Sequence, residues 1–304
     1  MYITFSLLKL FLAWLLIVGG ARRFQVELNH YAVHNRLFIS KVMNRAFIQV
    51  TSTILFLQDY AGYQHDHVRM HHNKEVFAGP NDPDWVFLRS LGLAPGMTRK
   101  ECWLWLARTV VSPEFHAKFL SSRLKANFLS PDTYRRWMSV GWTAALLATV
   151  SLCHEWIAFM VLCVFPLTVL YHIAALVQFS CEHKWNAPVI AGESARSRNA
   201  RLSLARYCIT APPLLEEDAS RGVKVCGWLV WLAVVISIDL PWRVFSIVGD
   251  MPVHDRHHNF AANTEWANVV YLDRDGGTLA SPECWGLIQS LNHVFDHIAA
   301  LPKE

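Results

Sequence analysis

The sequence predicts an all-α integral membrane protein with about three to four transmembrane helices, additional interfacial helices and a cytoplasmic cap rich in histidine. The 304-residue chain is 53% hydrophobic and only 17% charged, which is apolar for a soluble protein. Its 13 Trp suit a membrane interface, where one end of the ring is wet. Four apolar stretches alternate with segments that carry most of the charge. No internal repeat stands out, so we expect a single domain over residues 1–304.

The first apolar stretch, residues 2–21, is interrupted only by Lys9 and is followed by Arg22 and Arg23. It has some features of a signal peptide. A histidine cluster begins nine residues after Ala21, however, and cleavage there would leave that cluster with little support. We therefore expect a membrane anchor.

A later apolar stretch, residues 140–177, predicts a transmembrane hairpin. Its roughly 38 residues are enough to cross a ~30 Å hydrocarbon core twice at ~20 residues a crossing. We expect the turn at residues 153–156. No Lys or Arg lies between Arg136 and Lys184, so by the positive-inside rule the turn faces away from the cytoplasm and both ends face it.

The remaining apolar stretches, residues 46–60 and 225–248, are not expected to span. The second carries Asp239 and Pro241 near its middle and lies between His183 and His254. If these histidines serve one metal site, the segment between them makes an even number of crossings, and it is too short for two. We expect it to lie in the membrane interface or to be buried against other helices, and the same parity holds for residues 38–63.

Nine of the 15 histidines fall into four clusters with regular spacing. Three clusters contain an i,i+4 pair, which a helix presents on one face, and two of these add an adjacent histidine turned about 100° away. Neutral imidazole is the commonest nitrogen ligand of transition metals. Nine imidazoles are too many for one ion, and the HExxH motif of zinc hydrolases is absent. The clusters are HxxxH at His30 and His34, HxxxHH at His67, His71 and His72, a lone His183, and HxxHH at His254, His257 and His258.

Together with these clusters, their neighbouring residues carry a family resemblance. Arg23-Phe24-Gln25 leads into the first cluster, Asn81-Asp82-Pro83-Asp84 follows the second, and Glu182 precedes His183. Over about residues 20–260 the chain resembles the membrane fatty acid desaturase superfamily. That superfamily includes desaturases and hydroxylases and is related to the alkane hydroxylases.

The resemblance implies a non-haem di-iron oxygenase that uses O₂ on an unactivated C–H bond of an acyl or alkyl chain. It implies that two iron ions are held on the cytoplasmic face by His30, His34, His67, His71, His72, His183, His254, His257 and His258. Asp66, Glu182 and Asp255 adjoin these ligands and are candidates to orient them. Because the chain has no haem motif of a fused cytochrome b5, electrons would come from a separate ferredoxin, rubredoxin or cytochrome b5-type partner.

The sequence does not choose between desaturation and hydroxylation. The segment after His258 departs from the apolar, proline-containing run typical of acyl-lipid desaturases, which weakens desaturation against hydroxylation. A non-enzymatic metal transporter is a remote alternative, but its ligands would lie within the spanning helices near the midplane. The net charge of +4, without basic runs, predicts no nucleic-acid partner.

Overall fold

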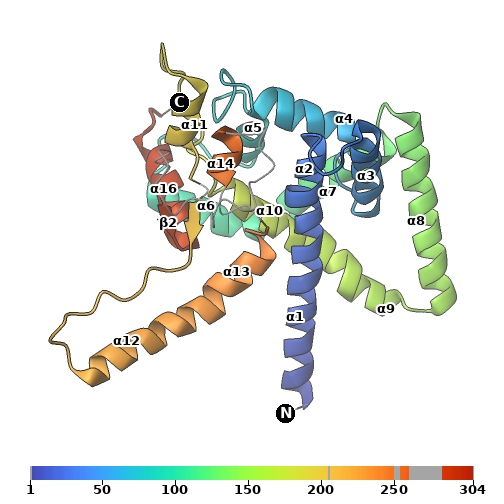
Figure 1. Cartoon of the computed structure of the whole chain (residues 1–304). Helices are drawn as coiled ribbons and strands as arrows, with labels where there is room; N and C mark the ends of the chain where they lie inside the picture. Colours follow the sequence, from blue (N-terminus) through green and yellow to red (C-terminus); the bar gives the residue numbers. More distant parts are fainter. Residues whose placement is uncertain (1, 205, 250–253, 260–282, 304) are drawn as a thin grey trace.

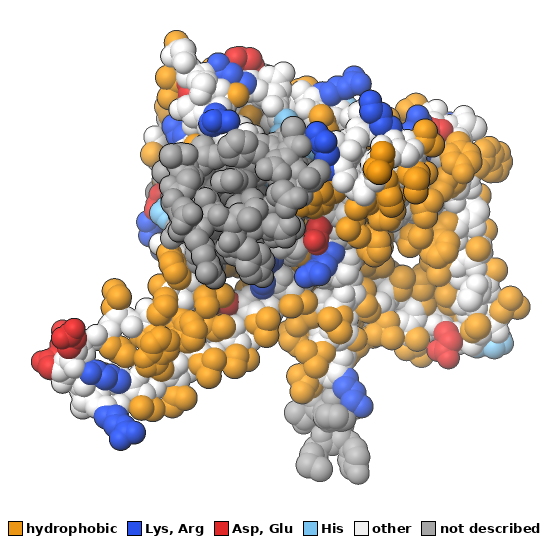
Figure 2. All heavy atoms as spheres, viewed as in Figure 1, with side chains coloured by type: hydrophobic (Ala, Val, Ile, Leu, Met, Phe, Trp, Pro, Cys, Tyr) orange, Lys and Arg blue, Asp and Glu red, His pale blue; other side chains and the backbone are white. Residues whose placement is uncertain are grey.

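Helices make up most of the structure, a computed structural model that describes residues 2–204, 206–249, 254–259 and 283–303 (Figure 1). Shorter helices gather in a cap at one end of the molecule. Helix α1, the turn between α8 and α9, and the tip of α12 all project from this cap toward the opposite end (Figure 1). Hydrophobic side chains are plentiful on the surface of these projecting parts (Figure 2), as expected for segments that meet lipid.

Helix α1 connects the predicted anchor directly to the first histidine cluster. It covers Tyr2–Arg23 and continues without a break through the π-helical turn η1, Phe24–Leu28, into α2, Asn29–Val33. Because the helix is continuous, the packing of α1 also determines where the histidines of α2 lie. The anchor packs through Val18 and Ala21 against a buried cluster that includes Tyr171.

The predicted hairpin is present, with its turn where the sequence places it. Helix α8 covers Thr133–Cys153 and ends at His154, whose backbone is left-handed at φ 57°. The chain then returns as one helix made of α9, η3, η4 and α10. These elements cover Trp156–Phe159, Met160–Val164, Pro166–Leu170 and Tyr171–Phe179. The returning helix ends just before His183, so the hairpin delivers this histidine to the cap.

Helix α3, Lys41–Ile54, is too short to cross a bilayer at 14 residues. It packs against α8 through the buried guanidinium of Arg135. That side chain donates to Ser52 Oγ at 2.8 Å, Thr53 Oγ1 at 2.8 Å and the backbone oxygen of Leu57 at 3.0 Å. The expectation that the second apolar stretch does not span agrees with this short, partly buried helix.

The fourth apolar stretch forms one long helix. Its parts are α12, Arg221–Val234, η5, Val235–Asp239, and α13, Leu240–Phe245. Residues 209–220 lead from the cap to the far tip of this helix, and Trp231 Nε1 donates to the backbone oxygen of Thr210 at 2.8 Å on the way. The helix then runs from the far tip back to the cap (Figure 1), so the chain leaves the cap before this stretch and reaches it again at the end of α13. Burial against other helices is ruled out along its apolar window, which is 0% buried.

Two helices among the described residues are long and apolar enough to cross a membrane, Trp156–Phe179 and Arg221–Phe245. The expected count of three to four crossings therefore stays a prediction.

The cap has a core of large side chains. Trp85, Trp185, Phe77, Leu176 and Phe295 are all fully buried in it. Its elements are α4 (Tyr60–Tyr63), η2 (Gln64–His71), α5 (Pro83–Ser90), α6 (Arg99–Val110), α7 (Pro113–Phe128), α11 (Ala195–Leu202), α14 (His254–Asn259) and α16 (Leu287–Ala300). The expectation of an all-α chain needs one correction. Two short strands, β1 (Arg206–Cys208) and β2 (Glu283–Trp285), pair in parallel and join the segment after α11 to the start of α16.

The crossing of α1 and α13 provides a test of the fold. At Gly19 the two helices approach so closely that an added Cβ would collide with the backbone oxygen of Val244. At neighbouring Gly20 an added Cβ meets nothing within 4 Å. We expect Gly19→Ala to lower stability by about 1–3 kcal/mol through overpacking. Gly20→Ala, the matched control, should be neutral or slightly stabilising because Ala is the better helix former. Thermal unfolding in detergent measures both, and equal melting temperatures for the two variants would contradict this packing.

Candidate metal centre

Four separate segments bring the predicted histidine ligands together inside the cap. The first pair lies at the end of α2, the second cluster lies in η2 and at its C-terminus, the single histidine follows α10, and the third cluster lies in α14. Eight of the nine side chains are described and form two adjoining groups. The side chain of His254 lies outside the described residues, although its backbone is the first position of α14.

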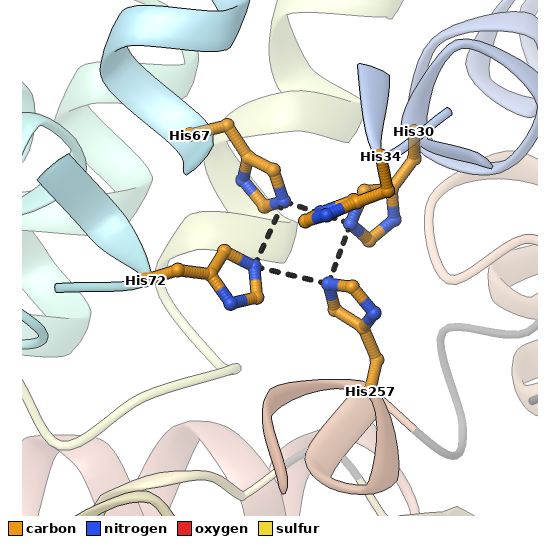
Figure 3. A group of neighbouring side chains, drawn as sticks. All are labelled: His30, His34, His67, His72 and His257. Atoms are coloured by element: carbon orange, nitrogen blue, oxygen red, sulfur yellow. Dashed lines mark hydrogen bonds between the residues drawn. The ribbon is translucent and has the colours of Figure 1, made fainter. Parts of the chain in front are cut away.

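The larger group contains five histidines, His30, His34, His67, His72 and His257, whose ligand atoms all lie within 4.8 Å of one another. The Nε2 atoms of four of them form a closed ring (Figure 3). Around this ring the Nε2–Nε2 distances are 2.8 Å for His67–His30, 2.9 Å for His30–His257, 3.0 Å for His257–His72 and 3.1 Å for His72–His67. His34 lies beside the ring (Figure 3).

Hydrogen bonding alone does not account for this ring. A given imidazole nitrogen either carries a proton and donates, or has a lone pair and accepts. Because each N–H points at one acceptor, four nitrogens can satisfy at most two of the four short contacts, and the other contacts have no proton between the two nitrogens. A cation at the centre would remove this conflict. If the ring is drawn as a square, its centre lies about 2.1 Å from each nitrogen, which is the usual length of a metal–imidazole bond.

The pKa values of the group suit metal binding, since a histidine must be neutral to be a ligand. Burial, followed by the charges of the neighbouring imidazoles, lowers the pKa of His67 well below its ordinary value. Burial and the nearby charge of Arg36 lower the pKa of His34 to about 4. These two imidazoles are therefore neutral at physiological pH.

The smaller group contains three buried histidines, His71, His183 and His258. Their ring centroids form a nearly equilateral triangle, with sides of 5.0, 4.9 and 4.9 Å. The two groups are neighbours, since the ring centroids of His72 and His258 are 4.7 Å apart. This geometry fits two metal sites side by side, with fewer imidazoles at the second.

The adjacent histidines in the second and third clusters divide between the two groups. His72 and His257 belong to the larger group, whereas His71 and His258 belong to the smaller one. This corrects the expected i,i+4 pairing of His67 with His71. The segment is π-helical, with the backbone N–H of His72 donating to the oxygen of His67 at 3.0 Å, so i and i+5 share a face.

Asp82 holds His71 in place, a role that sequence reasoning missed. Its carboxylate lies 2.9 Å from His71 Nδ1, accepts from the backbone N–H of Ala78 at 2.8 Å, and caps α5 by accepting from Asp84 N at 3.0 Å. Nδ1 of His71 faces Asp82, so Nε2 is the nitrogen that a metal would bind, and binding there would release the proton that Nε2 carries in the imidazolium. Burial works against protonation, but Asp82 and Asp84 outweigh it and raise the pKa of His71 to about 9. The Asp-Pro pair after the second cluster was the available signal.

The three carboxylates expected to orient ligands have different surroundings. Asp66 accepts from Gln58 Nε2 at 2.5 Å and lies 3.0 Å from His65 Nδ1, and neither residue is a predicted ligand. Glu182 is buried and accepts from Gln178 Nε2 at 2.9 Å. Burial, together with the charge of Asp84, raises the pKa of Glu182 to about 8. The side chain of Asp255 lies outside the described residues.

A cavity of about 550 Å³ opens beside the two groups, within the size range of small-molecule sites. His30, His67 and His71 form part of its wall. Apolar side chains from three different elements line other parts of the wall, including Leu57, Phe87 and Phe119. A substrate in this cavity would therefore touch both groups of histidines.

A family model described as "Fatty acid desaturase" matches residues 7–214. The matched segment covers about two thirds of the chain and holds the first two histidine clusters and His183. A search of the curated proteins and a search of the solved structures each found no match. Because the family match extends over more than half of the sequence, the chain belongs to the fatty acid desaturase family.

Proposed function

We propose that this protein is a membrane-bound, O₂-dependent non-haem di-iron oxygenase that desaturates a fatty acyl or alkyl chain at an unactivated C–H bond. The observation that carries the proposal is the ring of four imidazole nitrogens beside a second group of three imidazoles. With His34, which lies beside the ring, these make eight histidines, and the family resemblance assigns all eight positions to iron. Two iron ions bound in these groups would supply O₂ activation and the removal of hydrogen from the alkyl chain.

The chain's own residues prepare the site for this chemistry. The eight described histidines would hold the two ions, and His254 is proposed as the ninth ligand. Asp82 fixes the ring of His71 and keeps its proton on Nδ1. Leu57, Phe87 and Phe119 give the adjoining cavity apolar wall area, which favours an alkyl chain and excludes water from its reacting segment.

The position of the histidines argues against the transporter alternative. A metal passing through the membrane would need ligands within the spanning helices. None of the histidines in the two groups lies within Trp156–Phe179 or Arg221–Phe245, the two described helices able to span. The groups lie in the cap instead. We place this cap on the cytoplasmic face, where a separate ferredoxin, rubredoxin or cytochrome b5-type protein would deliver electrons.

The product of the reaction tests the proposal most directly. Expression in a host that lacks the gene should yield acyl or alkyl products that have lost two hydrogens. Mass spectrometry of extracted lipids and acids measures this loss. A product that has instead gained one oxygen would mean hydroxylation, which begins with the same hydrogen removal. The absence of either product in the presence of O₂, reductant and bound iron would contradict an oxygenase.

The larger histidine group can be tested by metal content. His257→Ala removes one corner of the nitrogen ring and should abolish activity and lower the iron bound per chain. His293→Ala is the matched control, because His293 lies on α16 outside both groups. Elemental analysis of the purified proteins gives the iron content. Wild-type iron and activity in His257→Ala would rule out the assignment.

The contact between Asp82 and His71 gives a separate prediction. Asp82→Asn keeps a good helix cap but removes the charge that orients His71, so metal affinity should fall by roughly 10–100-fold. Asp132→Asn is the control, since Asp132 caps α8 in the same way without facing a ligand. Competition with a chelator measures affinity, and unfolding of the metal-free proteins should show similar stability for both variants. Unchanged chelator competition in Asp82→Asn would show that Asp82 does not support the metal site.

A further inference from the structure

Arg22 is a fully buried cation in the wall of the cavity beside the metal centre. It occupies the last turn of α1 and is 0% exposed. Its Nη1 donates to Gln25 Oε1 at 2.7 Å, and its guanidinium lies 5.4 Å from the ring centroid of Tyr171. Gln25 also accepts a short hydrogen bond from the hydroxyl of Tyr171. The guanidinium is thus held on one side by a buried amide and an aromatic face.

Two other nitrogens of the guanidinium are left without a protein partner in the part of the chain that the structure describes. Nε and Nη2 of Arg22 are buried and have no hydrogen-bond partner among the described residues. These two N–H groups point in parallel and form the fork that binds a carboxylate through both oxygens. The protein uses this same fork elsewhere, where Arg201 Nε and Nη2 each donate to Glu193 at 2.8 Å. Arg22 therefore presents an unfilled carboxylate-binding fork.

The other charged groups of the cavity wall do not fill this fork. Arg123, a second buried cation, donates to the backbone oxygens of Phe56, Leu55 and Leu167 and contacts His172. Lys118 pairs with Glu114 at 2.8 Å outside the cavity. The lining carboxylates are Asp66, Asp84 and Glu182, and no ion pair joins any of them to Arg22 within the described part of the chain. A buried charge left without a partner is unfavourable, so a ligand is the natural partner.

We propose that Arg22 binds the carboxylate of the substrate, which is a free alkyl carboxylic acid. The inference rests on the proposed function and names its substrate class. Esters and thioesters lack the second charged oxygen that a two-pronged contact requires, so they are expected to bind more weakly. Lipid-linked and carrier-linked chains are therefore disfavoured.

The site also limits where the substrate reacts. Arg22 and His30 lie eight residues apart on one continuous helix, which corresponds to about 12 Å along the axis. A carboxylate on Arg22 would therefore fix the distance between the carboxyl group and the carbon that reacts. Oxidation is expected at one position counted from the carboxylate, whatever the length of the chain.

Binding of octanoate and methyl octanoate to the full-length, iron-loaded protein in lipid nanodiscs tests the proposal. Charge-assisted hydrogen bonds predict that octanoate binds roughly 10–100-fold more tightly than its ester, as measured by calorimetry. Arg22→Gln should remove this preference while leaving iron content unchanged. Arg23→Gln is the matched control, because Arg23 is the exposed neighbour and its loss should leave the preference intact.

Each outcome decides for or against Arg22. Equal binding of acid and ester to the wild type, or a preference retained in Arg22→Gln, would overturn the inference, and the first result needs no variant that might misfold. Displacement of octanoate by inorganic phosphate alone at equal concentration would also overturn it, since the fork would then hold a free oxyanion. Turnover is measured separately with O₂ and reductant. Arg22-dependent binding without any product would reject the proposed function and keep the carboxylate site. Equal oxidation of octanoate by wild type and Arg22→Gln would keep the proposed function and reject the carboxylate site.

Discussion

The close approach of four imidazole nitrogens is the constraint on which the rest of the structure depends. The four histidines of the ring come from three segments that are separated in the sequence. Around the ring, each Nε2 atom lies 2.8–3.1 Å from the Nε2 atoms of its two neighbours. Hydrogen bonds satisfy at most half of these contacts. The protein must therefore hold the rings together by packing elsewhere, as it does through the close crossing of α1 and α13 and the buried contacts of α10. A metal ion bound by these nitrogens would then satisfy the short contacts that hydrogen bonds leave unsatisfied.

Helical pitch decides how the histidines divide between the two groups. In an α-helix, His67 and His71 would face the same ion, whereas the π-helical segment turns His72 toward His67 and His71 toward His183. The adjacent pair in the third cluster divides in the same way. Two successive histidines thus link the sites, and a change in the pitch of one short segment would reassign them. Departures from α-helical geometry are frequent at functional sites for this reason.

Sequence reasoning singled out the histidines that the structure brings together, because histidine spacing is a local property. It also placed the α8–α9 turn correctly, because an apolar run and an absence of basic residues are visible along the chain. It missed the π-helix, since no residue in Gln64–His71 signals that pitch, and it missed the two strands, whose three-residue pairing is set by tertiary contacts. Asp82 escaped notice for a related reason. Carboxylates next to the ligands in sequence were favoured, but the one that reaches His71 lies eleven residues away.

In the proposed function, Asp82 would support a bound metal and Arg22 a bound substrate, and the surroundings of the two side chains differ accordingly. The carboxylate of Asp82 is fully engaged by His71 and backbone N–H groups, because a resident metal requires ligands whose orientation is fixed before it binds. The guanidinium of Arg22 is fixed by Gln25 and Tyr171 on one side only. A side chain whose hydrogen bonds are all made within the protein has none left to offer a ligand. A rigid side chain with N–H groups still unpaired gains those hydrogen bonds when a ligand binds. The buried charge that is unfavourable in the empty cavity thus favours a carboxylate over an uncharged chain of the same length.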